Sequence, residues 1–273
     1  MKENEKAIVL FRNISGKSKS PEVDSCIKNF KTYKNRVLCS NSLVIGRYST
    51  LPNYKELEED LLIIGSRLIN TYEQHKYISS FEYYTDIENY TPKTWFSLQQ
   101  IPDNKKLFIK GKTNSKKFDF PKSCIASNRK EASDVFFNLM SDSMIGDQGV
   151  VFREFVELDK IEDSVNGLPI SNEWRVFFIK DTVVDFGYYW SYIDDLEKVS
   201  KIKPDFISNG LPFAKKVAKI ISKKTNFFVI DVAKTSSGEW IVVEVNDGQQ
   251  SGLSLIDESL FYSRLSDTIN KIY

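Results

Sequence analysis

Two strongly β-forming segments near the carboxyl end, residues 227–235 and 239–247, constrain the fold more than any other feature of the sequence. Both are rich in Val, Ile and aromatic side chains, which are enriched in strands. Ser236, Ser237 and Gly238 lie between them and form a turn signal. The pattern predicts an antiparallel hairpin.

Polar side chains interrupt this hairpin. Asp231 stands inside the apolar run FFVIDVA, and Glu244 and Asn246 stand two residues apart in IVVEVND, so the latter two share one face of their strand. If the strands pair across the turn, all three side chains converge, and their hard oxygen ligands suit Mg²⁺. A charged group inside an apolar strand is costly unless it is paired or metal-bound. The alternative is that the three residues simply cover the wet face of an amphipathic hairpin.

The first hundred residues are predicted to form a mixed α/β unit. Apolar runs at 7–11 and 42–49 indicate strands, and a period of three to four residues from Leu57 to Leu68 indicates a helix that Gly65 weakens. Thr91 before Pro92 is typical of a helix start, so a helix is expected over Thr91–Ile101. The polar stretch that follows indicates a boundary near residue 103.

Beyond that boundary, short strands and amphipathic helices alternate. Lys180 and Asp181 separate two β-forming runs, which are predicted to form a second hairpin although the turn contains no glycine. The other expected strands are 107–111, 123–127 and 149–158, and the expected helices are 128–142, 212–225 and 259–272.

Bulk composition excludes several classes of protein. The net charge is +1, so no global field attracts nucleic acid or an anionic membrane, and no apolar stretch approaches the length of a membrane span. Cys26, Cys39 and Cys124 form neither a CxxC pair nor a disulfide framework, which favours a reducing cytoplasm. A zinc site or a Ser-His-Asp triad is not favoured, because His75 is the single histidine.

Three segments resemble one known superfamily in order and spacing. The hairpin sequence IDVAKTSSGEWIVVEVNDGQQSG is similar to the C-terminal signature of ATP-grasp ligases, particularly ribosomal-protein glutamate ligases. REFVEL resembles their interlobe hinge, and NEWRVFFIKDTVVDFGYYW resembles their Arg-bearing hairpin. The similarity covers about residues 104–255, and the first hundred residues resemble the pre-ATP-grasp region of a phage-type clade named for one arginine and two lysines.

The resemblance implies an α/β fold with α+β lobes, in which two ATP-grasp lobes clamp a nucleotide behind a small pre-ATP-grasp domain. It divides the chain into a pre-ATP-grasp domain (1–103), a small lobe (104–156) and a large lobe (157–273). The implied cofactors are ATP and Mg²⁺.

The resemblance also assigns the large-lobe site residues. Asp231, Glu244 and Asn246 are the implied magnesium ligands, and Arg175 is the implied catalytic residue that binds the γ-phosphate or the acyl-phosphate oxygens. A guanidinium suits that role because it is always charged and can donate two parallel hydrogen bonds to an anion. A surface ion pair is the alternative for Arg175.

Four more residues are implied to bind the nucleotide. Lys110 is expected to contact the phosphates, and Lys117 in the loop GKTNSKKF is the implied second lysine. Glu154 and Val156 in the hinge are expected to present main-chain groups to adenine. The alternative for the lysine-rich loop is a solvated turn.

The sequence departs from the glutamate ligases after Asn246, where it continues DGQQSGL rather than with small residues and proline. Gly248 and Gly252 still allow close approach of the backbone, but a changed acceptor pocket is expected. The aromatic residues in the segment Trp190–Lys198 either line an acceptor groove or cover core.

These features predict an ADP-forming ligase that activates a carboxylate as an acyl phosphate for attack by an amine. The expected partners are small-molecule or peptide carboxylates and amines, with no membrane. Two alternatives stay open, namely a non-catalytic ATP-binding module and a ligase or kinase that modifies nucleic acid with the same lobes.

Overall fold

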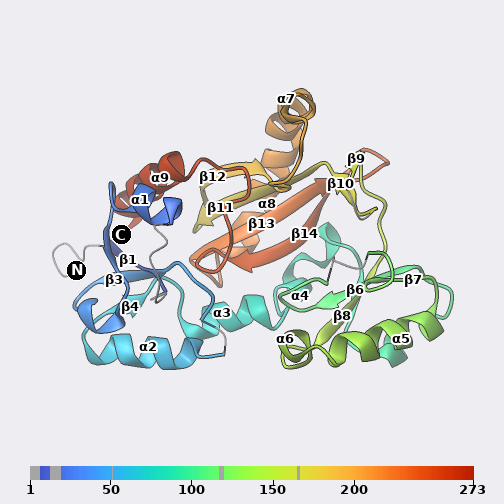
Figure 1. Ribbon diagram of the computed structural model, residues 1–273, viewed down its shortest axis with the longest axis horizontal. Coiled ribbons are helices and arrows are strands. Elements are labelled where there is room, and N and C mark those ends of the chain that lie inside the picture. The colour runs from blue at the N-terminus through green and yellow to red at the C-terminus, as the bar shows by residue number, and fades with distance from the viewer. Residues whose placement is uncertain (1–6, 13–19, 51, 117–119, 165–166) are drawn as a thin grey trace.

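The computed structural model describes residues 7–12, 20–50, 52–116, 120–164 and 167–273. These residues form three four-stranded sheets and one two-stranded sheet. The N-terminal sheet lies at one end of the molecule, the sheet with the longest strands lies in the middle, and the third lies at the other end (Figure 1). The expected mixture of α/β and α+β units is confirmed.

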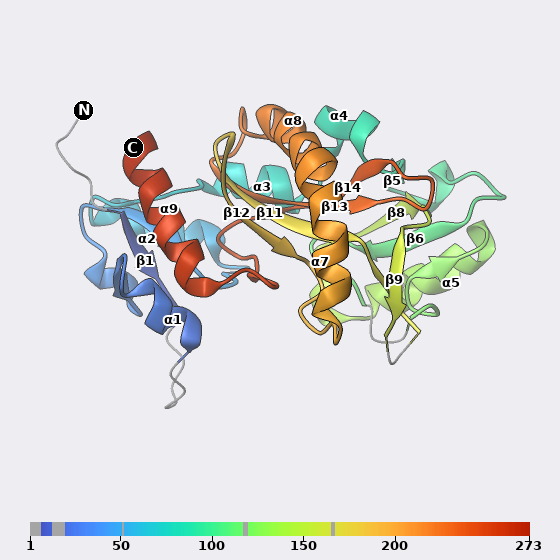
Figure 2. The same ribbon diagram turned by 90° about the horizontal axis from the view of Figure 1, so that it is seen from above.

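The N-terminal sheet is parallel, in the order β2-β1-β3-β4. One face packs on α2 through Leu57 and Leu61, and the other packs on α9, the last helix of the chain, through Leu265 and Ile269. Figure 2 shows α9 beside this sheet although the two are at opposite ends of the sequence. The elements are β1 (Ala7–Leu10), α1 (Pro21–Cys26), β2 (Lys31–Tyr33), η1 (Arg36–Leu38), β3 (Leu43–Gly46), α2 (Tyr54–Ile63), β4 (Arg67–Leu68), α3 (Tyr72–Ser79) and α9 (Glu258–Ile272).

The helix expected up to Leu68 is shorter than its periodicity suggested. α2 ends at Ile63, because Gly65 adopts a left-handed φ of 74° that terminates the helix. Leu68 instead lies in β4 and pairs with Val44 of β3.

The small-lobe sheet has the order β5-β8-β6-β7 and is antiparallel. The helix α5, capped by Asn128 as expected, covers it with Ala132, Val135 and Leu139. The elements are α4 (Tyr84–Ile87), η2 (Glu88–Tyr90), β5 (Thr94–Trp95), η3 (Leu98–Gln100), β6 (Leu107–Gly111), β7 (Ile125–Ala126), α5 (Arg129–Met140), α6 (Ser143–Gly146) and β8 (Val150–Glu154).

The helix expected over Thr91–Ile101 is wrong. Thr94 and Trp95 form β5 and pair with Arg153 and Phe152 of β8, and only η3 is helical in this segment. β-branched and aromatic residues favour the strand over a helix once a partner strand is available. The division of the chain at residues 103 and 156 stays a prediction, although β5 already joins the small-lobe sheet.

The large-lobe sheet has the order β12-β11-β13-β14 and is antiparallel throughout, so both expected hairpins are confirmed. Lys180 takes the left-handed turn position, with a φ of 54°. α8 covers one face, and α7 projects away from the sheet (Figure 1). The elements are β9 (Lys160–Asp163), β10 (Pro169–Ser171), β11 (Glu173–Ile179), β12 (Thr182–Tyr188), α7 (Leu196–Asp205), the π-helix η5 (Phe206–Gly210), α8 (Leu211–Ile221), β13 (Phe227–Lys234) and β14 (Trp240–Asp247).

None of the described helices combines the length and the apolar character that crossing a bilayer requires.

Candidate active site

Two cavities lie along β14, one beside its first half and one beside its second half. The first, which we call the hinge cavity, has a volume of about 410 Å³ and lies beside the segment 153–158 that joins the lobes. Its walls are mainly apolar and include Phe108, Leu168 and Trp190. The second, which we call the polar cleft, has a volume of about 470 Å³. Its lining is mainly polar and includes Arg175, Glu244, Asn246 and Asp247.

Strand register explains how the functional side chains meet. Arg175 of β11 pairs with Asp231 of β13, and Asp231 pairs with Glu244 of β14. Directly paired residues in an antiparallel sheet point to the same face, so the three side chains form one row across three strands. Asn246 lies two residues along β14 and therefore on the same face. The convergence predicted for the hairpin is confirmed, although it depends on a register shift between Asp231 and Val232 that brings Asp231 opposite Glu244.

Arg175 and Asp231 form a bidentate ion pair. Nε and Nη2 of Arg175 donate to the two carboxylate oxygens of Asp231 at 2.9 and 2.8 Å. Burial alone would lower the pKa of Arg175, but the charge and hydrogen bonds of Asp231 outweigh it, and the pKa is raised. Nη1 donates to the carbonyl of Gly252 at 2.9 Å, and the guanidinium lies 4.9 Å from the ring centre of Tyr189. The surface ion pair considered for Arg175 is therefore excluded, because Asp231 is fully buried.

Lys110 and Glu244 form the second ion pair of the site. Lys110 lies on β6 of the small-lobe sheet and Glu244 on β14 of the large-lobe sheet, so the pair joins the two lobes. The side chain of Lys110 is 4% exposed and that of Glu244 is 15% exposed. Glu244 is thus the carboxylate of the row that reaches the polar cleft.

The donors present fit a magnesium ion in part. Glu244 and Asn246 both line the polar cleft and offer hard oxygens. Both oxygens of Asp231 accept from Arg175, and Nδ2 of Asn246 lies 3.4 Å from one of them. Within the described ranges, no group of three or more His, Cys, Asp or Glu side chains could hold a metal ion.

The comparison with protein families decides the classification. The family described as the ATP-grasp domain, R2K clade family 3, matches residues 89–265. The chain belongs to this ATP-grasp clade. No curated protein matches the chain significantly.

Solved structures share the ATP-grasp fold at low sequence identity. The D-cycloserine synthetase DcsG matches with a TM-score of 0.56 and 11% identity, covering 96% of this chain and 99% of its own. A RimK domain ATP-grasp protein from Sphaerobacter thermophilus matches with a TM-score of 0.54 and 12% identity, covering 94% and 98%. The ATP-grasp ligase PsnB, in complex with a minimal precursor, Mg and ADP, matches with a TM-score of 0.53 and 10% identity, covering 98% of both chains.

Three predicted nucleotide-binding residues of this ATP-grasp chain remain to be described, namely Glu154, Val156 and Lys117. Glu154 and Val156 line the hinge cavity, where the resemblance placed them. The partly exposed side chain of Glu154 forms an ion pair with Lys105 at 2.6 Å. Lys117 lies outside the described residues.

Arg153 was missed by the sequence analysis. It is 5% exposed, donates to the carbonyl of Val243 on β14, and donates to Oγ1 of Thr91 at 2.5 Å. It therefore links the strand before the hinge to the large lobe, at the wall of the hinge cavity. Burial lowers the pKa of Arg153, the sign of a cation held in a mainly apolar setting. A charged residue inside the apolar strand VVFRE was the available signal.

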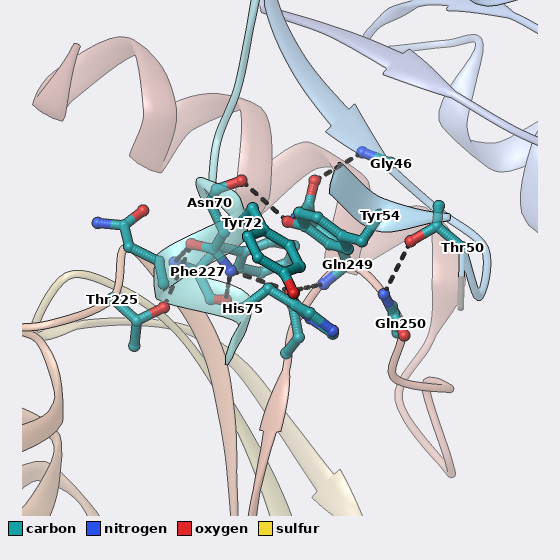
Figure 3. Close-up of polar contacts among 12 residues, drawn as sticks. Gly46, Thr50, Tyr54, Asn70, Tyr72, His75, Thr225, Phe227, Gln249 and Gln250 are labelled. Carbon is teal, nitrogen blue, oxygen red and sulfur yellow. Dashed lines mark hydrogen bonds and ion pairs between the residues drawn. The ribbon is translucent and has the colours of Figure 1, made fainter. Parts of the chain in front are cut away.

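The loop after Asn246 is also held by residues that the sequence did not reveal. Arg47 donates to the carbonyl of Gly248 at 2.6 Å, and Gln249 accepts from the N–H of Gly46 at 2.9 Å and donates to Tyr54. Figure 3 shows Gln249 and Tyr54 among the polar side chains that meet at this junction. A Cβ at Gly248 would lie 2.7 Å from the ring of Phe227, so this glycine does permit a close approach. The DGQQSG loop is thus fixed against the N-terminal sheet.

Within the segment Trp190–Lys198, the first aromatic residue, Trp190, packs in the core. Trp190 is buried in the large-lobe core and forms part of the hinge cavity. Tyr192 is exposed, and α7 begins at Leu196.

Proposed function

We propose that this R2K-clade ATP-grasp protein is an ADP-forming ligase that uses ATP and Mg²⁺ to activate a carboxylate and join it to an amine. The observation that carries the proposal is the row Arg175, Asp231 and Glu244, which sets cations and carboxylates together at one end of β14. DcsG and PsnB, whose names describe a synthetase and a ligase, share the fold and support the reaction class.

The nucleotide base belongs in the hinge cavity under this proposal. The cavity is mainly apolar and is lined by Glu154 and Val156, which supports binding of a flat heteroaromatic ring with main-chain groups of these two residues as its proposed contacts. The phosphates then extend along β14 towards Lys110 and Arg175, with Lys117 as the second lysine of the clade.

The proposed metal ligands are Asp231, Glu244 and Asn246. Glu244 and Asn246 line the polar cleft, which supports their assignment. Asp231 takes part only if Arg175 releases one carboxylate oxygen. When bound, the metal supplies positive charge that screens the phosphate oxygens.

A change of partners on nucleotide binding would give both ion pairs a role in the reaction. Lys110 neutralises Glu244 and Arg175 neutralises Asp231, so the buried charges are paired before the nucleotide binds. Lys110 would turn to phosphate oxygens when the nucleotide binds, which would free Glu244 to hold the metal. Because the Lys110–Glu244 pair joins both lobes, the exchange also links nucleotide binding to the relative position of the lobes.

A carboxylate does not react directly with an amine, because its leaving group is poor. Phosphorylation of the carboxylate oxygen gives an acyl phosphate, and the amine nitrogen then displaces phosphate. Arg175 stabilises the charge on the transferring group through a preorganised guanidinium, and the two lobes exclude water. No covalent protein nucleophile is required.

The test is ATP turnover with pooled substrates. Purified protein is incubated with ATP, Mg²⁺ and pools of amino acids, peptides and small carboxylates, and the products are identified by mass spectrometry. We expect ADP, phosphate and an amide whose formation needs both pools. AMP with pyrophosphate would contradict acyl-phosphate chemistry. Binding of ATP without turnover would favour a non-catalytic module, and phosphorylated or ligated nucleic acid would favour the third class.

The proposal places the protein in the cytoplasm, in a phage-type setting as the clade resemblance implies. Its three cysteines are buried thiols without disulfide bonds, which fits a reducing compartment.

A further inference from the structure

The single histidine of the chain lies in the wall of the polar cleft. His75 belongs to α3, is 3% exposed, and lines the same cleft as Arg175, Glu244 and Asn246. Its ring stacks on Tyr54 with the ring centres 4.1 Å apart and an interplanar angle of 11°. The stacking fixes the plane of the imidazole.

Asp247 determines which ring nitrogen carries the proton. Nδ1 of His75 lies 3.0 Å from Oδ2 of Asp247. Oδ1 of Asp247 accepts from Nδ2 of Asn70 and from the N–H of Gln249, both at 2.9 Å. A carboxylate surrounded by donors is an acceptor, so Nδ1 carries a proton, and Nε2 is the ring nitrogen left to meet another group.

Nε2 is buried and has no hydrogen-bond partner within the part of the chain that the structure describes. A buried polar atom without a partner costs free energy, so its retention points to a donor from outside the chain. The arrangement is a base held in orientation by a carboxylate, as in other proton-accepting histidines.

The position of His75 in the cleft indicates which substrate supplies that donor. The adenine is assigned to the hinge cavity and the phosphates to the end of β14. The rest of the polar cleft is therefore left for the other substrates. The lining of the cleft also includes the hydroxyl side chains of Ser49, Ser79 and Ser251, and the charged group next to His75 is the carboxylate of Asp247. This lining suits a small polar amine better than a second anion.

We propose that Nε2 of His75 accepts the proton of the acceptor amine, with Asp247 as the residue that positions the ring. This inference rests on the proposed ligase function. The amine nitrogen attacks the carbonyl carbon of the acyl phosphate, the C–N bond forms, and the C–O bond breaks with its electron pair leaving on phosphate. The proton released from nitrogen goes to Nε2 and then to solvent or to the departing phosphate.

Nuclear magnetic resonance of the imidazole tests the first half of the inference without any substrate. Because the chain has one histidine, protein labelled with ¹⁵N-histidine gives a single imidazole. At neutral pH we expect Nδ1 to be protonated and Nε2 to show the chemical shift of an unprotonated nitrogen. An imidazolium, or the tautomer with the proton on Nε2, would overturn the proposal even if the ligase reaction is established.

The second test uses His75→Asn, because Nδ2 of asparagine can still donate to Asp247 while the Nε2 position is lost. Hydroxylamine serves as a probe nucleophile. It is less basic than an ordinary amine, so it is unprotonated at neutral pH, and the proton that its nitrogen releases on attack is acidic enough to pass directly to water. With the amino-acid and peptide pools, we expect amide formation to fall by about 10²-fold or more, the usual contribution of a general base. Hydroxamate formation from the same carboxylates should stay close to the wild-type rate.

Lys76→Ala is the matched control, since Lys76 is the next residue on α3, is exposed, and pairs only loosely with Glu73 at 3.9 Å. It should leave both rates unchanged. Equal loss of amide and hydroxamate in His75→Asn, or no loss of either, would overturn the role of His75. If the wild type forms neither product from the pools, the ligase proposal fails, and the imidazole spectrum still decides the state of His75.

Discussion

The hinge cavity and the polar cleft are similar in volume but differ in how they are built. The hinge cavity has apolar walls, and its predicted nucleotide contacts are main-chain groups. The polar cleft depends on named side chains with charge, and it draws on three parts of the chain: Ser49 and His75 from the N-terminal unit, Thr113 from the small lobe, and Glu244 from the large lobe. Substitutions should therefore be tolerated at the first cavity and damaging at the second.

The two ion pairs beside the polar cleft also differ, because one lies within a single sheet and the other joins two sheets. Arg175 and Asp231 lie on adjacent strands of one sheet and are joined by two hydrogen bonds, so their geometry is fixed. Lys110 and Glu244 lie on different sheets. Under the proposed function, the first pair positions the catalytic guanidinium, and the second is expected to separate when the nucleotide binds.

The largest effect is expected at the proposed metal ligands. Glu244→Gln and Asn246→Ala should abolish ATP turnover, because the first replaces a charged carboxylate by a neutral amide and the second removes an oxygen ligand from the polar cleft. Both proteins should still unfold cooperatively, since both side chains are partly exposed and lie outside the apolar core. Turnover is measured on the substrate pair found with the pools, and unfolding by thermal melting. Full activity in either variant would contradict the metal assignment.

Arg175→Ala should lower the turnover rate by about 10²-fold or more, roughly the cost of one preorganised donor. Affinity for ATP should change much less, because the interaction strengthens in the transition state. Arg175→Lys keeps the charge but loses the fork, so it should recover only part of the rate. Arg175 is the only arginine between residues 154 and 263, so no neighbour in that span replaces it.

Stability provides the control for Arg175, since Arg175→Ala leaves Asp231 buried without its cation. That loss should cost about 3–5 kcal/mol of unfolding free energy, as for other broken buried pairs. The double variant Arg175→Ala with Asp231→Asn removes the unpaired charge and should regain part of the stability but none of the rate. Recovery of turnover in the double variant would show that Arg175 acts through stability alone.

Removal of divalent metal should weaken ATP binding, because the phosphates would then face Glu244 without a bridging cation. Calorimetric titration with ATP in Mg²⁺ and in excess EDTA measures the difference. Equal affinity in both solutions would argue against a metal site at β14.

The smallest effect is expected at the hinge cavity. Glu154→Ala removes an ion pair with Lys105 in which both side chains are about a third to a half exposed, and such pairs contribute about 0–1 kcal/mol. ATP affinity and turnover should both stay near wild type. A large loss of affinity would mean that the Glu154 side chain, rather than its main chain, contacts the nucleotide.

Local pattern predicted only part of the row of polar residues. Alternation within β14 places Glu244 and Asn246 on one face, but Asp231 pairs with Glu244 because the register shifts between Asp231 and Val232. Without that shift, the register next to the turn would pair Asp231 with Val243, and the sequence carried no signal for it. The segment Thr91–Ile101 shows the limit of such reasoning, because its strand forms only when β8 is present as a partner.

The supports of the polar cleft could not be predicted in this way. His75 and Asp247 are 172 residues apart, and Gly46 and Gln249 are 203 apart. Neither pair has a local signal in the sequence, because it is the packing of α9 and the C-terminal loop on the N-terminal sheet that brings them together. The sequence alone therefore did not predict that the N-terminal unit contributes Ser49 and His75 to the cleft.

A crystal structure with Mg²⁺ and a non-hydrolysable ATP analogue tests the central claim most directly. We predict the adenine in the hinge cavity beside Glu154 and Val156, the terminal phosphate near Arg175 and Lys110, and the metal bound by Glu244 and Asn246. A nucleotide bound elsewhere, or a metal without contact to Glu244, would contradict the account.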